Sequence, residues 1–379
     1  HGVLDNWNRL QYEYDSFFFV ADWHALTTSY DDPTDIEANI REMVIDWLAA
    51  GINPSSATIF VQSDIPEHAE LHLLLSMITP LGWLERVPSY KDQQEKLKEK
   101  DLATYGFLGY PLLQSADILM YRAAHVPVGE DQVAHVELTR EVARRFNHLY
   151  GRGQEFEKKV KRALKNLGGK NKKVYLAAQK AYQEKGDATD LQAARTLVEN
   201  HPRLTVADRE RLLGNLEGLG RTILVEPDAL LTEYPKVPGL DGQKMSKSYG
   251  NTIALRDDAE TVEKKIKTMP TDPARVRRSD PGDPEKCPVW QLHAVYSDES
   301  TKNWVREGCT TAGIGCIDCK RPVIEKIEAQ LQPIRERARS YEDNPETVRT
   351  VLADGRDRAR DIARETMDDV REAMMLEYR

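Results

Sequence analysis

The sequence lacks any apolar run long enough to cross a bilayer, and no signal-peptide pattern opens it. It is also poor in cysteine, with four in 379 residues, all between Cys287 and Cys319. Four clustered thiols are too few for the disulfide framework of a secreted protein. The remaining composition, 40% hydrophobic and 30% charged, is ordinary for a globular chain. We therefore expect a cytoplasmic protein, not a membrane protein, with room for two domains and a sizeable core.

Acidic residues outnumber basic ones overall, but positive charge is concentrated in one stretch. The net charge is −9, which argues weakly against a nucleic-acid partner. Residues 151–185, however, hold eleven Lys or Arg and only three Glu. Such an excess predicts contact with the phosphates of a nucleic acid. A charged helical hairpin with a solvated face explains the same residues, and the sequence leaves both interpretations open.

Short apolar runs alternate with helical patterns in the first half of the chain. We predict strands at residues 17–21, 57–61 and 125–128. The capping box Thr34-x-x-Glu37 predicts the start of an amphipathic helix that ends at Gly51. Further helices are expected near residues 115–122 and 131–147. This alternation predicts an α/β fold with a Rossmann-like, doubly wound parallel sheet.

Polar residues follow all three expected strands, at residues 22–24, 62–64 and 129–132. Each group could simply cap the next helix. In a doubly wound sheet, however, ligands bind beyond the carboxyl ends of the strands. Three polar groups at one edge therefore predict a binding site.

The domain organisation follows from changes in pattern. Residues 1–255 form the expected catalytic domain, interrupted by a basic helical insert at about 151–222. Residues 256–379 are helical in pattern and form the expected C-terminal α-helical domain. Its apolar residues recur at heptad-like spacing, at Ile324, Ile327, Leu331 and Ile334.

The run Lys244-Met245-Ser246-Lys247-Ser248 follows a glycine-rich turn. Two lysines around a hydroxyl residue can hold a triphosphate by charge, with serine and backbone donors adding contacts. A lone K-x-x-K is also found in solvated loops. The complete run resembles the signature loop of class I aminoacyl-tRNA synthetases.

Several further segments together resemble tryptophanyl-tRNA synthetases. They are Gly2–Gln11, the strand and turn through His24, Ile59–Leu71, Tyr110–Leu119 and Val126–His135. The run Val-Pro-Val-Gly-Glu-Asp-Gln within the last segment separates the chain from the sister tyrosyl enzymes. The His-x-Gly-His-type loop of the family should lie just before Gly2, and we expect it in a leader that precedes His1.

The resemblance implies two steps: formation of tryptophanyl-adenylate from ATP, then transfer to tRNA(Trp). It assigns catalysis to Lys244, Ser246 and Lys247, which would hold the departing pyrophosphate together with Mg²⁺. It assigns ATP binding to that loop and to the segment after the third strand: Gly129, Glu130, Asp131, Val237, Lys244, Met245, Ser246, Lys247 and Ser248.

For the amino acid, the resemblance makes Asp117 the acceptor of the indole N–H. A buried carboxylate left without that donor is costly, so a phenyl ring would be rejected. Tyr110 and Gln132 correspond to positions that bind the α-amino group. The expected pocket wall comprises Phe19, Val20, His24, Val126 and Val128. Gln114 stands where relatives often carry Met, which leaves the pocket shape there open.

The cysteines form the pattern Cys287-x₂₁-Cys309-x₆-Cys316-x₂-Cys319. Four thiolates suit zinc and an iron–sulfur cluster equally well, so the spacing predicts a metal site without choosing the metal. A subset of tryptophanyl-tRNA synthetases carries a [4Fe–4S] cluster at this spacing, near the tRNA anticodon region. The resemblance therefore favours iron–sulfur, with zinc as the alternative and a structural or RNA-contacting role. It also implies a homodimer.

Two other functions stay open. One is a non-catalytic paralogue that binds tryptophan or RNA and senses through the cysteine site, although an intact lysine loop has no use in such a protein. The other is a tyrosyl enzyme, against which the segment Val126–Gln132 argues.

Overall fold

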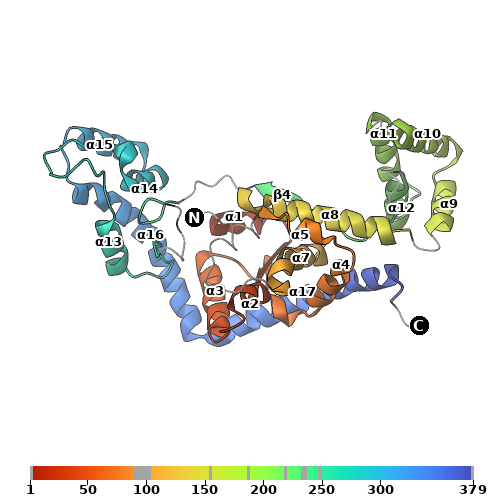
Figure 1. Cartoon of the computed structure of the whole chain (residues 1–379), viewed down its shortest axis with the longest axis horizontal. Coiled ribbons are helices and arrows are strands. Elements are labelled where there is room, and N and C mark those ends of the chain that lie inside the picture. The colour runs from red at the N-terminus through yellow and green to blue at the C-terminus, as the bar shows by residue number, and fades with distance from the viewer. Residues whose placement is uncertain are drawn as a thin grey trace. The chain divides into compact units, whose positions relative to one another are not determined.

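The computed structural model describes residues 3–88, 104–152, 156–185, 188–216, 220–231, 237–243, 245 and 250–376. It divides into two compact units, each assembled from three segments of the chain. The first unit comprises His1–Val20, Thr34–Phe60 and Thr232–Gly355, and the second Ala21–Pro33, Val61–Leu231 and Arg356–Arg379. Figure 1 labels their α-helices and strand β4.

The first unit begins with helix α1 (Val3–Leu10), strand β1 (Ser16–Val20), helix α3 (Ile36–Ala50) and strand β2 (Ala57–Val61). Strands β1 and β2 pair in one sheet, which confirms two of the three predicted strands. Aromatic packing fixes α1 and α3 against this sheet. Trp7 stacks on Phe18 at 4.4 Å between ring centroids and meets Trp47 edge-on at 5.4 Å.

Helix α3 confirms the predicted stop and begins within one residue of the predicted start. Gly51 adopts φ +114°, a left-handed conformation that suits glycine at a helix end. At the other end the N-cap is Asp35, with no side-chain cap hydrogen bond. The helix therefore begins within one residue of the start that the box at Thr34 predicts, and the box itself stays a prediction.

Helices complete the first unit. They are α13 (Ala259–Thr268), the 3-10 helix η4 (Pro284–Lys286), α14 (Pro288–Tyr296), α15 (Glu299–Thr310), α16 (Cys316–Asp343) and the first part of α17 (Pro345–Ala373). Their core includes Ile327 and Leu331, with Ile324 and Ile334 packed against it. The predicted heptad-like positions are thus confirmed as the apolar face of α16. No helix in the described residues is apolar over a length that could span a membrane.

The second unit holds the third predicted strand, β3 (His125–Val128). It pairs in parallel with β4 (Asp228–Leu231), so that Val126 lies opposite Ala229. The sequence analysis missed β4, whose pairing with β3 joins residues about a hundred positions apart. The helical elements here are α2 (Asp22–Ser29), η1 (Gln62–Asp64), α4 (Glu67–Ser76), α5 (Leu81–Leu84), α7 (Tyr105–Met120), η2 (Glu130–Gln132) and α8 (Val133–Tyr150).

Helix α7 begins ten residues before the prediction. Pro111 lies inside it, and proline usually ends a helical pattern. Thr104 caps the start by accepting a hydrogen bond from the Phe107 amide at 3.2 Å. Pro111 itself is buried, so tertiary packing outweighs the lost backbone hydrogen bond.

The basic insert forms helices α9 (Phe156–Asn166), α10 (Gly169–Lys185), α11 (Ala188–Glu199) and α12 (Val206–Leu216). Its predicted helical character is confirmed. The helices enclose a core of their own, which includes Val160, Tyr175 and Leu212. The Tyr175 hydroxyl donates to the Leu212 carbonyl at 2.6 Å inside this core.

Candidate active site

Asp117, on α7, lies at the centre of a buried hydrogen-bond network. Only 3% of the residue is exposed. Its Oδ1 accepts hydrogen bonds from Gln62 Nε2 at 2.8 Å and from His68 Nδ1 at 2.6 Å. Its Oδ2 accepts one from His24 Nε2 at 2.8 Å. The sequence analysis predicted Asp117 and His24 in one site, and the structure brings them together.

The network keeps a buried carboxylate ionised. Burial alone raises the pKa of Asp117, but hydrogen bonds from His24 and His68 outweigh it and hold the pKa at about 2. Buried charges are rare unless they are compensated. A full negative charge with N–H donors around it is therefore the defining chemical feature of this pocket.

The network extends one residue further, to Tyr121 at the end of α7. Its hydroxyl lies 2.6 Å from His68 Nε2. Burial, followed by the charges of Asp117 and Glu67, raises the pKa of Tyr121 far above its usual range. The phenol therefore keeps its proton at any physiological pH.

Two of the polar strand ends meet as predicted. Asp22 follows β1 and Ser63 follows β2, and Asp22 Oδ1 accepts a hydrogen bond from the Ser63 amide at 3.1 Å. Asp22 is itself buried. This bond ties α2, which carries His24, to the segment that carries Gln62, so that both can reach Asp117.

A second polar group surrounds Tyr110 and Gln114, two turns and one turn before Asp117 on α7. Gln114 Oε1 accepts from His135 Nδ1 at 2.5 Å. The Tyr110 hydroxyl lies 3.5 Å from His135 Nε2, and its ring meets His24 edge-on at 6.4 Å. Tyr110 and Gln114 therefore lie in the same region as His24 and Asp117, in keeping with their predicted place in one pocket.

The other predicted pocket residues lie on strands. Val126 and Val128 are half-buried on β3, in the unit that holds Asp117. Phe19 and Val20 end β1 in the first unit, where Phe19 stacks on Phe60 at 5.4 Å. Their predicted contact with the indole ring stays a prediction.

The segment predicted to bind ATP ribose and adenine leads from β3 into α8. Glu130 and Asp131 are exposed on η2, and Gln132 Nε2 donates to Asp131 Oδ2 at 3.3 Å. A Cβ at Gly129 would lie only 2.8 Å from Asp131 Oδ1. Glycine thus leaves space for the Asp131 side chain where η2 leads into α8. The N–H groups at the start of a helix point outward, and anions bind favourably there.

Lys244, Ser246, Lys247 and Ser248 lie outside the described residues, whereas the base of their loop is defined. Asp241 Oδ1 accepts from the Gln243 amide at 2.9 Å and from Asn251 Nδ2 at 2.7 Å, so it joins both ends of the loop. Gly242 has φ +80° and lies against Pro288, which a Cβ would approach within 2.9 Å. Of the other two residues predicted to bind ATP near this loop, Val237 packs against the helical core of the first unit and Met245 is half-buried.

The four cysteines come together in the first unit. Burial, followed by the nearby Cys287, Cys309 and Cys316, raises the pKa of Cys319 to about 12. Arg275 Nη1 lies 3.9 Å from Cys309 Sγ, and His293 Nε2 lies 3.4 Å from Cys319 Sγ. Even so, among the described side chains no three His, Cys, Asp or Glu are arranged to hold a single metal ion.

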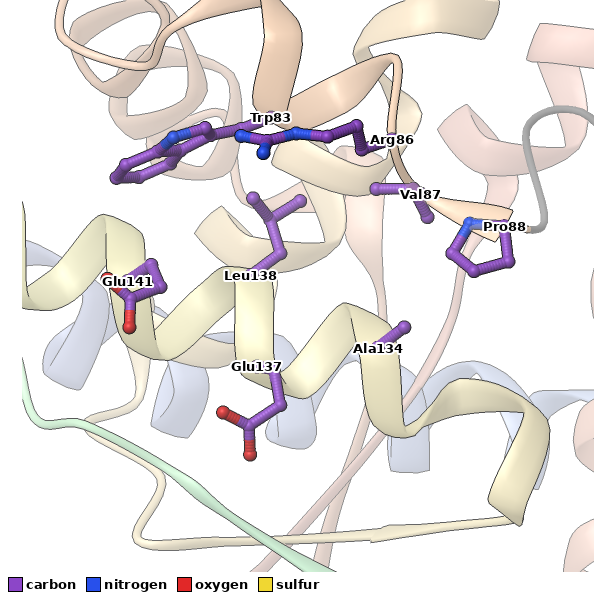
Figure 2. Close-up of a pocket in the computed structure, with 8 residues that line it drawn as sticks. All are labelled: Trp83, Arg86, Val87, Pro88, Ala134, Glu137, Leu138 and Glu141. Atoms are coloured by element: carbon purple, nitrogen blue, oxygen red, sulfur yellow. The ribbon is translucent and has the colours of Figure 1, made fainter.

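A cavity of about 350 Å³ lies elsewhere in the second unit. Figure 2 shows Ala134, Glu137, Leu138 and Glu141 on one wall, along α8, and Trp83 and Arg86 opposite them. None of its lining residues belongs to the Asp117 network. Nearby, the guanidinium of Arg145 lies 5.9 Å from the Trp83 ring centroid. This cavity is therefore separate from the candidate active site.

Comparison with known proteins identifies the fold around this site. The family described as tRNA synthetases class I (W and Y) matches residues 1–185 and 201–332. The chain belongs to this family. A tryptophan–tRNA ligase of Ralstonia nicotianae is 65% identical over 378 residues, covering 100% of this chain and 94% of that protein. One of Thermotoga maritima is 44% identical over 380 residues, again covering 100% and 94%.

A solved structure of a tryptophanyl-tRNA synthetase is also similar to this chain. Tryptophanyl-tRNA synthetase of Campylobacter jejuni, in complex with ADP and tryptophan, matches with a TM-score of 0.73 and 28% identity. The match covers 98% of this chain and 93% of that chain. The predicted Rossmann-like fold with a helical C-terminal region is thereby confirmed.

Sequence reasoning missed four residues of this class I site: Gln62, His68, Tyr121 and His135. Gln62 stood in a recognised polar group but was not assigned to the site. His68 and His135 lie within the segments that carry the resemblance. Gln62, His68 and His135 are buried polar residues and Tyr121 is half-buried, and a polar residue in an otherwise apolar stretch was the available signal.

Proposed function

We infer that the chain is a tryptophan–tRNA ligase. It activates L-tryptophan with ATP to tryptophanyl-adenylate and transfers the tryptophanyl group to tRNA(Trp). The observation that carries this inference is 65% identity along the whole chain to a tryptophan–tRNA ligase. Class I chemistry makes the enzyme ATP-dependent, and Mg²⁺ is typical of the family.

Asp117 is the proposed specificity residue. Its ionised, buried carboxylate is a strong acceptor for the indole N–H, and tyrosine and phenylalanine have no N–H in the ring. A site built to bond such a donor can discriminate by about 10⁴- to 10⁵-fold against an analogue that lacks it. Tyr110 and Gln132 are proposed to bind the α-amino group. His24, Gln114, Phe19, Val20, Val126 and Val128 complete the proposed pocket.

In the first step the tryptophan carboxylate attacks the α-phosphorus of ATP and pyrophosphate leaves. The protein contributes position and charge rather than covalent chemistry. Gly129, Glu130, Asp131 and Val237 are proposed to hold the nucleoside. Lys244, Met245, Ser246, Lys247 and Ser248 are proposed to close on the phosphates, with Mg²⁺ on their oxygens. The hydrogen-bonded base at Asp241 supports a loop whose two ends are held together.

The four-cysteine site is proposed to hold a [4Fe–4S] cluster, with zinc as the alternative. The residues present suit a bulky thiolate-bound group. Cys287, Cys309, Cys316 and Cys319 supply four sulfurs, and Arg275 and Lys320 supply positive charge beside them. A Cβ at Gly282 would lie 2.7 Å from Cys309 Sγ, so glycine leaves space where this sulfur lies. The proposed role is structural or RNA-contacting.

The proposed domain plan follows the chemistry. Residues 1–255 activate tryptophan, and residues 256–379 bind the tRNA anticodon and carry the cysteine site. The insert at about 151–222 is proposed to contact tRNA phosphates, and the enzyme to act as a homodimer. The helical character of the insert and of the C-terminal region supports this plan.

ATP–pyrophosphate exchange tests the function, measured with tryptophan, tyrosine and phenylalanine on full-length, metal-replete protein. We expect exchange with tryptophan only. Asp117→Asn keeps the shape but removes the charge, and it should lower kcat/KM for tryptophan about 100-fold or more. If the protein exchanges pyrophosphate with none of the three amino acids, the proposed ligase function is contradicted and a non-catalytic binding paralogue is favoured. Exchange with tyrosine would indicate the tyrosyl enzyme.

A further inference from the structure

Three side chains that support Asp117 have no role in the chemistry above: Gln62, His68 and Tyr121. We propose that Gln62 and His68 saturate Oδ1 of Asp117, so that Oδ2 is the oxygen that accepts the indole N–H. We also propose that Tyr121 fixes the tautomer of His68 which this arrangement requires. The three are positioning residues, and the inference rests on the proposed role of Asp117.

Counting acceptor positions supports the choice of oxygen. Each carboxylate oxygen offers about two lone-pair sites. Oδ1 receives two hydrogen bonds, from Gln62 and His68, and both of its sites are filled. Oδ2 receives one from His24 and keeps one site. The carboxylate thus presents a defined acceptor, rather than two equivalent oxygens between which a ligand could choose.

Tyr121 determines which nitrogen of His68 carries a proton. A phenol that keeps its proton can donate to His68 Nε2 across the 2.6 Å separation. A neutral imidazole that accepts at Nε2 carries its proton on Nδ1. That proton points at Asp117 Oδ1, 2.6 Å away. The opposite tautomer would place a lone pair of Nδ1 against the carboxylate.

The amide of Gln62 has a fixed orientation for a similar reason. Its Nε2 faces the carboxylate, since the reversed amide would set oxygen against oxygen. The Gln62 side chain is fully buried, and its Oε1 has no hydrogen-bond partner in the part of the chain that the structure describes. The network therefore has more hydrogen-bond acceptors than donors. A ligand with an N–H group can supply a missing donor.

The test separates positioning from simple structural support by using two ligands. L-Tryptophan and 3-benzothienyl-L-alanine have similar shapes, but the second carries sulfur in place of the indole N–H. Dissociation constants are measured by calorimetry on the full-length protein. The variants are His68→Leu, which removes the donor, His68→Asn, whose amide can replace Nδ1, and Tyr121→Phe. Tyr175→Phe is the matched control, because it removes a buried hydroxyl in the insert.

We expect His68→Leu to weaken tryptophan binding about 10- to 100-fold, the usual value of a hydrogen bond to a charged group. Tyr121→Phe should weaken it about 3- to 10-fold, as for a neutral hydrogen bond. His68→Asn should restore most of the affinity, and Tyr175→Phe should have no effect. Binding of the benzothienyl analogue should change less than about threefold in every variant, since it makes no N–H bond.

Equal weakening for both ligands would overturn the proposal, because it would show that His68 only supports the fold. If His68→Leu fails to fold, His68→Asn and Tyr121→Phe decide by the same comparison. Asp117→Asn tests the underlying function separately. If that variant binds both ligands as the parent does, the assignment of Asp117 itself fails. If it loses tryptophan selectively while the His68 and Tyr121 variants do not, only the present inference fails.

Discussion

At the scale of single residues, the site depends on one buried charge and its donors. Asp117 remains ionised because His24 and His68 donate to it, although burial opposes the charge. Removing one donor from a buried charge costs more than the net value of the bond, because the charge stays buried. Even conservative substitutions of the side chains around Asp117 should therefore change substrate selectivity strongly.

Glycine at position 282 provides a test at the same scale. In Gly282→Ala the new Cβ would lie 2.7 Å from Cys309 Sγ, closer than any tolerated contact, so the sulfur must move. We expect the bound metal per chain to fall by about half or more, as ligand geometry is strict. Elemental analysis of iron, sulfide and zinc measures this and also identifies the metal.

Gly106→Ala is the matched control, because nothing lies within 4 Å of the added Cβ. It should keep the full metal content. Metal content that stays unchanged in Gly282→Ala would contradict the proposed geometry of the cysteine site. A protein with zinc and no iron would decide against the cluster.

At the scale of elements, acid sensitivity can be assigned to a helix cap. Asp298 caps α15 and accepts from the Thr301 amide at 2.8 Å. This bond, with further bonds from Thr301 and Ser300, lowers the pKa of Asp298 to about 2. A lowered pKa in the folded state adds stability above the unfolded-state value, and this stability is lost as pH falls towards 2.

Asp298→Asn should therefore reduce the loss of unfolding free energy between about pH 4 and pH 2, since asparagine caps helices without titrating. Urea unfolding at a series of pH values measures it. Glu299→Gln removes the adjacent carboxylate but leaves the cap, and the acid-dependent loss attributed to Asp298 should persist. The same pH profile in Asp298→Asn as in the parent would show that this cap does not titrate as described.

Element prediction succeeded where local pattern and packing agree. The strands at 17–21, 57–61 and 125–128 and the stop of α3 at Gly51 were predictable from local chemistry. The start of α7 was not, because Pro111 argues locally for a break that burial overrides. Strand β4 was missed, since its parallel pairing with β3 joins residues about a hundred positions apart.

At the scale of the whole molecule, charge is distributed unevenly. The insert buries Val160, Ala163 and Leu164 on one side of α9, while basic residues cover the exposed side. Those on α9 are Lys158, Lys159, Lys161, Arg162 and Lys165. A self-contained core beneath a basic surface allows this surface to change without loss of the fold.

The insert prediction follows from counterion release. Lys161→Gln, Arg162→Gln and Lys165→Gln together should lower the salt slope of tRNA binding by about 1 to 3, at roughly 0.7–0.9 per lost phosphate contact. Filter binding over a range of salt concentrations measures it, with pyrophosphate exchange as a check on the active site. Glu157→Gln, on the same exposed face, should not lower the slope. An unchanged slope in the triple variant would support the solvated-face interpretation.

The sequence alone determined the class of the protein. Local patterns set most of the helices and strands, because these signals need only neighbouring residues, and the resemblance carried by the motifs predicted Asp117, Tyr110 and His24 in one site. The tertiary structure decided how Asp117 is held. Gln62 and His68 lie about fifty positions before Asp117 and Tyr121 in sequence, and only folding brings these four side chains within 3 Å of their partners in one network. Burial then gives these contacts their strength, because it removes the water that would otherwise compete for the charge.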